Sequence, residues 1–267
     1  MSTTQQVQIH PLRPSPARYF LQPWSFILNN ANLMEVVSTS SEGLDFPTTN
    51  VLKITAENGG GSGLVPAAQP QFRTSDGYIP LPAVGEDIFY RYYLRVEVPN
   101  SYIADPLTHG TQDADDFGKR NWQHELVTKA NGTYDLRISV TNGAGTNAWP
   151  NFFWRTNLSK GQTYRIEQRI SRIGTNQFTL EARVYDINNN LVRDLSDFQN
   201  ADESASLDDS VPLNFGTGGV AQLGAFRTGL NSLVGNHSAG MFPFTFAYIG
   251  GIAICRTTWC GAYQNGM

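Results

Sequence analysis

Arginine, tyrosine and glutamate side chains alternate with apolar ones in the segment 87–98 of the sequence. Arg91, Tyr93 and Arg95 fall on one parity of this expected strand, and the bulky apolar residues fall on the other. Arginine forks and aromatic rings suit the carboxylates and hydroxyls of sugars. A ladder of charges on a solvated sheet face would have the same pattern, because opposite charges on neighbouring strands pair there. The segment alone is compatible with either role.

A second segment with reactive side chains is the expected strand 121–127, NWQHELV. Gln123 and His124 are adjacent, so the pleat of a strand sends them to opposite faces. His124 shares its parity with Trp122 and Leu126, which favours a packing role over that of a base. The residues that we predict to bind a ligand are Arg91, Tyr93, Arg95, Gln123, Glu125, Arg137 and Trp149.

Trp149 belongs to an aromatic cluster, NAWPNFFW, at residues 147–154. If Trp149 and Trp154 are exposed, their rings can stack on sugar rings. Buried aromatic residues that close the end of a sandwich are the commoner case. The cluster is therefore compatible with a binding site or with a core.

Two sets of residues have side chains that bind metals. Asp113, Asp115 and Asp116 lie in a long expected loop, and calcium prefers several oxygen ligands from a flexible loop. Most acidic loops are only solvated, so the expected cofactor is none, or Ca²⁺ at these aspartates. Cys255 and Cys260 are the only cysteines and lack further soft ligands nearby, which disfavours zinc. Two ordinary thiols are favoured over a disulfide for such a pair.

The segment 161–193 determines the fold class. It reads as two long strands with strict alternation, in which apolar residues fall on one face and charged residues on the other. Alternation of this length is typical of a half-buried antiparallel hairpin. Similar patterns in 87–98 and 133–140, with no long amphipathic helix, predict an all-β sandwich of two antiparallel sheets. Its charged faces are expected to be in water.

Composition excludes several classes of function. The chain has 267 residues, 16% charged, with a net charge of −4. An acidic chain is not a generic nucleic-acid binder. The most apolar stretch, 242–255, is broken by glycines and too short to span a bilayer. The N-terminus has no apolar run typical of a secretory signal.

We expect two parts in the chain. Residues 1–18 contain Pro11, Pro14 and Pro16, which exclude helix and predict an extended arm. Residues 19–267 are long enough for one β-sandwich domain. Arms of this kind add to a neighbour's sheet. The arm predicts a homo-oligomer or a larger protein assembly, located in a virion or on an extracellular surface.

The order of these segments resembles the concanavalin A-like jelly roll, particularly laminin-G-like domains and jelly-roll polysaccharide lyases. The resemblance spans residues 20–255 and implies a fold more than an activity. The segments that carry it are FYRYYLRVEV (89–98), NWQHELV (121–127), GQTYRIEQRI (161–170), FTLEARVYDINNNLV (178–192) and FAYIGGIAI (246–254).

Three functions follow from these observations. We expect a non-catalytic module that binds a polysaccharide or surface glycan, as a decoration or attachment subunit of a virion or similar assembly. The alternative is a polysaccharide lyase, in which Arg91 or Arg95 with Gln123 neutralises a uronate carboxylate, and Tyr93 or His124 exchanges protons. Alginate lyases place Gln and His two residues apart on a strand, unlike Gln123 and His124, which disfavours the lyase. Glycoside hydrolysis would need paired carboxylates, for which Glu167 and Glu181 are candidates.

Overall fold

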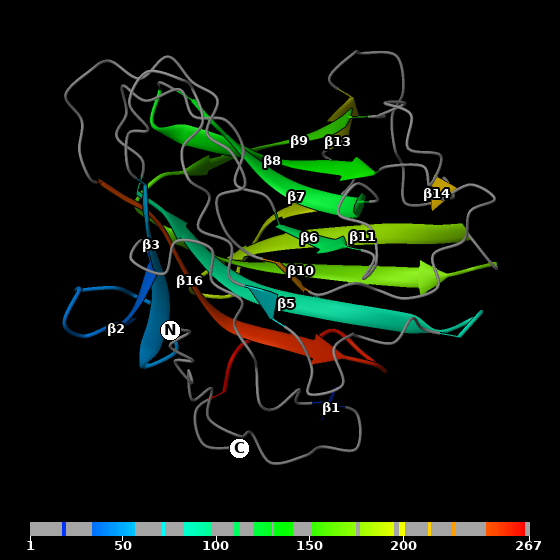
Figure 1. The fold of residues 1–267 in the computed structure, drawn as a ribbon, viewed down its shortest axis with the longest axis horizontal. Helices are drawn as coiled ribbons and strands as arrows, with labels where there is room; N and C mark the ends of the chain where they lie inside the picture. The colour runs from blue at the N-terminus through cyan, green and yellow to red at the C-terminus, as the bar shows by residue number, and fades with distance from the viewer. Residues whose placement is uncertain are drawn as a thin grey trace, which may run out of the picture.

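The computed structural model consists of strands arranged in two antiparallel sheets stacked face to face (Figure 1). Every regular element within the described residues is a strand, and no helix among them is long and apolar enough to cross a bilayer. The structure describes residues 18–19, 34–56, 71–72, 83–97, 109–112, 120–129, 131–140, 151–174, 177–194, 198–200, 213–214, 226–227 and 244–264.

The first sheet, named the β5 sheet after its central strand, has the order β12-β11-β10-β5-β16-β3-β2. β1 also pairs with β16, and β14 with β11. Its strands are β1 (Arg18–Tyr19), β2 (Met34–Ser38), β3 (Asn50–Ala56), β5 (Asp87–Val96), β10 (Thr163–Arg172), β11 (Gln177–Asp186), β12 (Leu191–Asp194), β14 (Leu213–Asn214) and β16 (Phe244–Cys255).

The second sheet, the β7 sheet, has the order β13-β9-β8-β7-β6-β15-β4. Its three shortest strands come from segments without a strong alternation in the sequence. Its strands are β4 (Gln71–Phe72), β6 (His109–Gln112), β7 (Arg120–Thr128), β8 (Thr133–Val140), β9 (Asn151–Ser159), β13 (Phe198–Asn200) and β15 (Phe226–Arg227).

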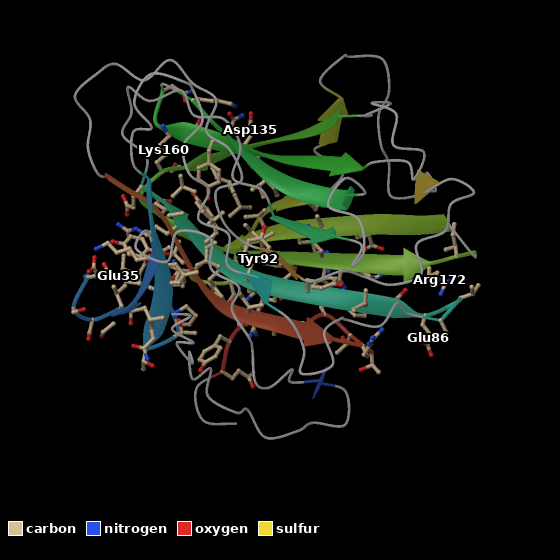
Figure 2. All side chains as sticks on the ribbon, viewed as in Figure 1. Glu35, Glu86, Tyr92, Asp135, Lys160 and Arg172 are labelled. Carbon is tan, nitrogen blue, oxygen red and sulfur yellow. A yellow bond between two sulfur atoms is a disulfide. The ribbon has the colours of Figure 1, made fainter. Side chains whose placement is uncertain are left out.

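The core lies between the sheets and is built from the apolar parity that the sequence indicates. Tyr92 and Leu94 of β5 lie opposite Ile166 and Tyr164 of β10, and all four are buried. The ring of Tyr134 in β8 meets Tyr164 edge to face, with centroids 6.5 Å apart. This contact identifies the inner faces of both sheets, and Figure 2 shows Tyr92 in the middle of the molecule. The predicted antiparallel sandwich is confirmed.

The outer face of the β5 sheet is covered, contrary to our expectation of a charged face in water. Residues 256–264, here called the C-terminal clasp, lie over β5 and β10 and bury Phe89, Arg91 and Glu167. Trp259 of the clasp packs edge to face on Phe89, with ring centroids 5.5 Å apart.

A disulfide between Cys255 and Cys260 joins β16 to the clasp. The prediction of two free thiols is therefore wrong. Both cysteines are buried against Phe89 of β5. The two cysteines meet because the chain folds back over the β5 sheet after β16. The C-x4-C spacing alone does not predict this path.

Candidate functional site

Arg91 is a buried structural residue. Its Nε donates a hydrogen bond to the carbonyl of Gly251 and its Nη1 to that of Gly261, both at 2.9 Å. The guanidinium also lies 5.7 Å from the centre of the Tyr263 ring. Only 2% of Arg91 is exposed. The bond to Gly261 and the contact with Tyr263 hold the clasp on the sheet.

Tyr93 and Arg95 also take part in structural contacts. The hydroxyl of Tyr93 accepts a hydrogen bond from the main-chain N–H of Tyr263 at 3.0 Å, and its ring is buried. Arg95 is ion-paired with Glu97 and Asp45. The residues predicted on β5 thus contact the protein's own clasp and loops.

The structure does not bring the predicted ligand residues into one groove. Arg91 and Tyr93 are on the outer face of the β5 sheet, whereas Gln123, Glu125 and Arg137 are on strands of the β7 sheet. The core separates the two sheets, so their outer faces lie on opposite sides of the molecule. Arg91 and Tyr93 therefore do not share a sheet face with Gln123, Glu125 and Arg137.

The outer face of the β7 sheet carries a row of polar residues. Its inner face is identified by Tyr134 and Leu136, which are buried. Positions of the other parity therefore belong to the outer face, since alternate residues of a strand lie on opposite sides. Paired positions across six strands form this row, called the polar row, which consists of Gln71, Arg227, Gly110, Gln123, Ser139 and Asn151.

A second row on the same face runs beside the polar row. Glu125 is paired with Arg137, and Arg137 with Phe153. His124 is on the inner parity, opposite Ile138, as the pleat argument predicts. Of the residues predicted from sequence, Gln123, Glu125 and Arg137 thus occupy one sheet face.

Arg227 and Gly110 were not among the predicted site residues. Arg227 lies opposite Gln71 on one side and Gly110 on the other, and Gly110 lies opposite Gln123. Arg227 follows Gln123 by more than a hundred residues and lies in a strand of two residues. No spacing in the sequence links them, because only long-range strand pairing brings them together.

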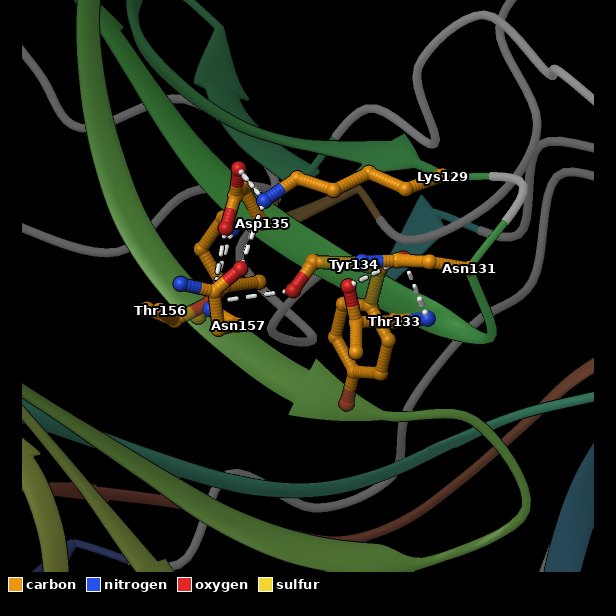
Figure 3. A network of polar contacts seen from close by, with 8 residues as sticks. Lys129, Asn131, Thr133, Tyr134, Asp135, Thr156 and Asn157 are labelled. Carbon is orange, nitrogen blue, oxygen red and sulfur yellow. Dashed lines mark hydrogen bonds and ion pairs between the residues drawn. The ribbon is translucent and has the colours of Figure 1, made fainter.

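A polar network fixes the end of the β7 sheet where β8 and β9 meet (Figure 3). The register shifts there between Tyr134 and Leu136. The carboxylate of Asp135 accepts a hydrogen bond from the N–H of Asn157 at 2.9 Å and is ion-paired with Lys129. Nζ of Lys129 also donates to Oδ1 of Asn157 at 2.7 Å. The network holds an irregular pairing in place beside the second row.

Glu167 and Glu181 do not form the carboxylate pair that a glycoside hydrolase would need. Glu167 is 2% exposed under the clasp and ion-paired with Arg165 at 3.4 Å. Glu181 is ion-paired with Arg169 at 2.9 Å. In the register, Glu167 lies opposite Arg183, and Glu181 opposite Arg169. Arginines therefore occupy the positions that a second carboxylate would take.

The burial of Glu167 predicts a pH dependence of stability. Burial raises the pKa of Glu167, although Arg165 and Arg91 oppose this effect. A raised pKa in the folded state means that the folded protein binds the proton more tightly than the unfolded chain does. This contribution to stability is complete below the ordinary pKa of 4.5 and is lost as the pH rises through the raised pKa.

We expect Glu167→Gln to flatten the plot of unfolding free energy against pH in the range above pH 4.5. The measurement is the free energy of unfolding in urea between neutral and mildly acidic pH, for wild type and variant. Asp186 is the comparison, because its hydrogen bonds with Asn190 lower its pKa. Asp186→Asn should leave the profile unchanged in this pH range, because a pKa lowered from 3.8 affects stability only at more acidic pH. Parallel profiles for Glu167→Gln and wild type would contradict the assignment.

The remaining predicted residues, Trp149, Asp113, Asp115 and Asp116, lie outside the described residues. The proposed calcium site at these aspartates stays a prediction. In the described part of the chain, no group of three or more His, Cys, Asp or Glu residues is arranged to hold a metal ion. Residues 1–17 of the expected arm also lie outside the described residues.

Solved structures similar to this one include polysaccharide lyases. An endo-β-1,4-glucuronan lyase from Trichoderma reesei superposes with a TM-score of 0.54 and 14% identity, over 90% of this chain and 94% of that one. An alginate lyase from Pseudomonas aeruginosa has a TM-score of 0.53 and 12% identity, over 90% and 100% of the two chains. No family model and no curated protein sequence matches.

The chain therefore has the concanavalin A-like jelly-roll fold that its sequence resembles. The same comparison corrects our expectation of a non-catalytic display subunit of a virion. The two structures named above, which share the fold over nine-tenths of this chain, are lyases, and this agrees with the alternative interpretation.

Proposed function

We propose that the protein is a polysaccharide lyase that cleaves a polymer containing uronic acid by β-elimination. One observation carries the proposal: Arg227 and Gln123 share the polar row on the outer face of the β7 sheet, with only Gly110 between them. The fold shared with a glucuronan lyase and an alginate lyase supports the same reaction class.

Neutralisation of the substrate carboxylate is the first requirement of this reaction. The proton at C5 of a uronate becomes acidic only when the neighbouring carboxylate loses its charge. Arg227 can bind a carboxylate with two parallel hydrogen bonds, and the amide of Gln123 can add a third. Strands lie about 4.8 Å apart, so the two residues are roughly 10 Å apart at the backbone. Gly110 has no side chain, which leaves room for the sugar between them.

Proton transfer is the second requirement. Tyr93 and His124 are not used in this proposal, because Tyr93 is bonded to the clasp and His124 is on the inner parity. Glu125 lies two residues from Gln123 on the same face, opposite Arg137. In the proposed step Glu125 removes the proton from C5, the electron pair forms the C4–C5 double bond, and the C4–O bond breaks. The departing oxygen takes a proton from water.

The test is incubation with soluble alginate, glucuronan and a heparin-type polymer. A lyase produces an unsaturated uronate at each new chain end, which absorbs in the ultraviolet. We expect this absorbance to rise with at least one of the polymers and not with a neutral glucan of similar length. Reducing ends without ultraviolet absorbance would indicate hydrolysis and overturn the proposal. No product from any polyuronate would also overturn it.

The arm-and-domain division, the oligomeric state and the location of the protein stay predictions. The mass of the full chain in solution tests the oligomer. A monomer would remove the reason for assigning a pairing role to residues 1–18.

A further inference from the structure

The turn between β7 and β8 carries an asparagine whose side-chain carbonyl is held by two donors. Oδ1 of Asn131 accepts a hydrogen bond from the hydroxyl of Thr133 at 2.7 Å and another from the main-chain N–H of Thr133 at 3.2 Å (Figure 3). Asn131 is exposed, and the residue after it is Gly132. We propose that Asn131 is a site of spontaneous covalent modification, at which the side chain reacts with its own main chain, loses ammonia and becomes aspartate or isoaspartate.

The reaction is an intramolecular acyl transfer. A base from the solvent removes the proton from the main-chain nitrogen of Gly132, and this nitrogen attacks Cγ of Asn131. A new N–C bond forms, the bond from Cγ to the side-chain nitrogen breaks, and ammonia leaves, so that a cyclic imide remains. Water then opens the imide at either of its carbonyl groups. One opening gives aspartate, and the other gives isoaspartate, in which the main chain runs through the former side chain.

Glycine at position 132 removes the steric obstacle to this attack, because any other residue would place a Cβ beside the attacking nitrogen. Gly132 has φ of 83°, which glycine adopts without strain. The N–H of Lys129 donates to the carbonyl of Thr133 at 2.8 Å and closes a three-residue loop, a type in which the last loop residue is left-handed. The turn therefore favours glycine at the position where the reaction also favours it.

The two hydrogen bonds to Oδ1 act on the atom that gains charge during the reaction. When the nitrogen attacks Cγ, Oδ1 becomes an oxyanion, and donors already aimed at such an oxygen lower the barrier. The bond from the N–H of Thr133 also makes an Asx-turn, in which the side chain of Asn131 folds back toward the main chain that follows it. Thr133 is therefore a positioning residue for the reaction of Asn131 with Gly132.

This arrangement distinguishes Asn131 from the other asparagines that precede a glycine. Only at Asn131 does a threonine follow the glycine, and the other pairs lie outside the described residues. The Asn-Gly pairs of the chain are at 58–59, 131–132, 142–143 and 265–266.

The two products should differ in their effect on the turn. Aspartate keeps the main chain and an Oδ1 that can accept from Thr133. Isoaspartate lengthens the main chain by one atom inside the loop that the bond between Lys129 and Thr133 closes. It also shifts the carbonyl of Gly132, which accepts a hydrogen bond from the N–H of Lys160 at 3.0 Å. Chains with isoaspartate should therefore melt at a lower temperature than Asn131→Asp.

The first test compares native and denatured wild-type chain, so it does not depend on a variant that folds. The purified full chain is stored at mildly alkaline pH with or without guanidinium chloride and then digested with trypsin. Cleavage after Lys129 and Arg137 releases residues 130–137, in which Asn131 is the only asparagine. Mass and chromatographic retention separate the asparagine, aspartate and isoaspartate forms. We expect the modified forms to accumulate faster in the native chain, and more slowly at mildly acidic pH. Equal or slower modification in the native chain would overturn the proposal.

The second test isolates the hydroxyl of Thr133. Thr133→Val keeps the shape of the side chain, and it should lower the rate in the native chain by roughly tenfold, less than the loss of a donor from an enzyme's oxyanion hole. In guanidinium chloride its rate should equal that of wild type. The matched control is Thr48→Val, which removes a half-buried hydroxyl bonded to the carbonyl of Asn50. It should leave the rate unchanged. A wild-type rate in native Thr133→Val would overturn the part assigned to Thr133.

Discussion

Replacing Arg227 with methionine should lower kcat/KM on the preferred polyuronate by about 10²–10³-fold, as loss of one preorganised anion-stabilising group commonly does. Methionine keeps the length of the side chain but cannot neutralise a carboxylate. Because the charge matters most when the C5 proton leaves, most of the loss should fall on kcat. Steady-state rates of ultraviolet product formation measure both parameters.

Two further variants separate this role from a general effect of charge. Arg227→Lys keeps the charge but loses the bidentate geometry, so its activity should lie between those of wild type and Arg227→Met. Arg183→Met removes an arginine that is 37% exposed on the opposite side of the sandwich, on the β5 sheet. It should leave the rate unchanged. Wild-type activity in Arg227→Met would remove Arg227 from the site.

Replacing Gly251 with alanine should destabilise the protein by about 2–5 kcal/mol. Gly251 has φ of 58°, a conformation that costs an L-residue about 1–2 kcal/mol. An added Cβ would lie 2.7 Å from Cδ2 of Tyr93. The Tyr93 ring is held by its bond to Tyr263 and by packing against Phe46, so overpacking should add about 1–3 kcal/mol. Urea unfolding measures the loss.

Gly43→Ala is the matched control for this prediction. Gly43 has a similar φ of 65°, but an added Cβ would meet nothing within 4 Å. Its substitution should cost only the conformational part, about 1–2 kcal/mol. Equal losses in the two variants would show that the contact with Tyr93 contributes nothing.

The sequence was sufficient to predict those features that depend on local alternation. The inward parity of β5 and the pairing of β10 with β11 agree with the sheet register, because each strand carries its own pattern. The burial of Arg91 was not predictable. Its partners Gly251 and Gly261 are 160 and 170 residues away in the chain, and no local pattern reports them.

The candidate site also depends on long-range contacts that local sequence patterns do not predict. Gln123 and Arg137 could be named because they lie in long alternating strands, β7 and β8. Arg227 and Gln71 lie in strands of two residues, too short to have a period. The residues beside Arg227 and Gln71 depend on the order of strands in the sheet, in which β15 pairs with β4 and β6. The sequence therefore identifies the charged residues of the long strands, but it does not predict which of them share a sheet face.

The position of β16 has a consequence for how the chain folds during synthesis. β16 ends at Cys255, yet it lies between β5 and β3 inside the β5 sheet. While the ribosome is still making residues 244–264, β5 has an open edge, and Arg91 and Glu167 have no cover. Unpaired strand edges favour aggregation of nascent chains. We therefore expect β16 to insert between β5 and β3 slowly and only after synthesis is complete. Chaperones that shield strand edges should help this step.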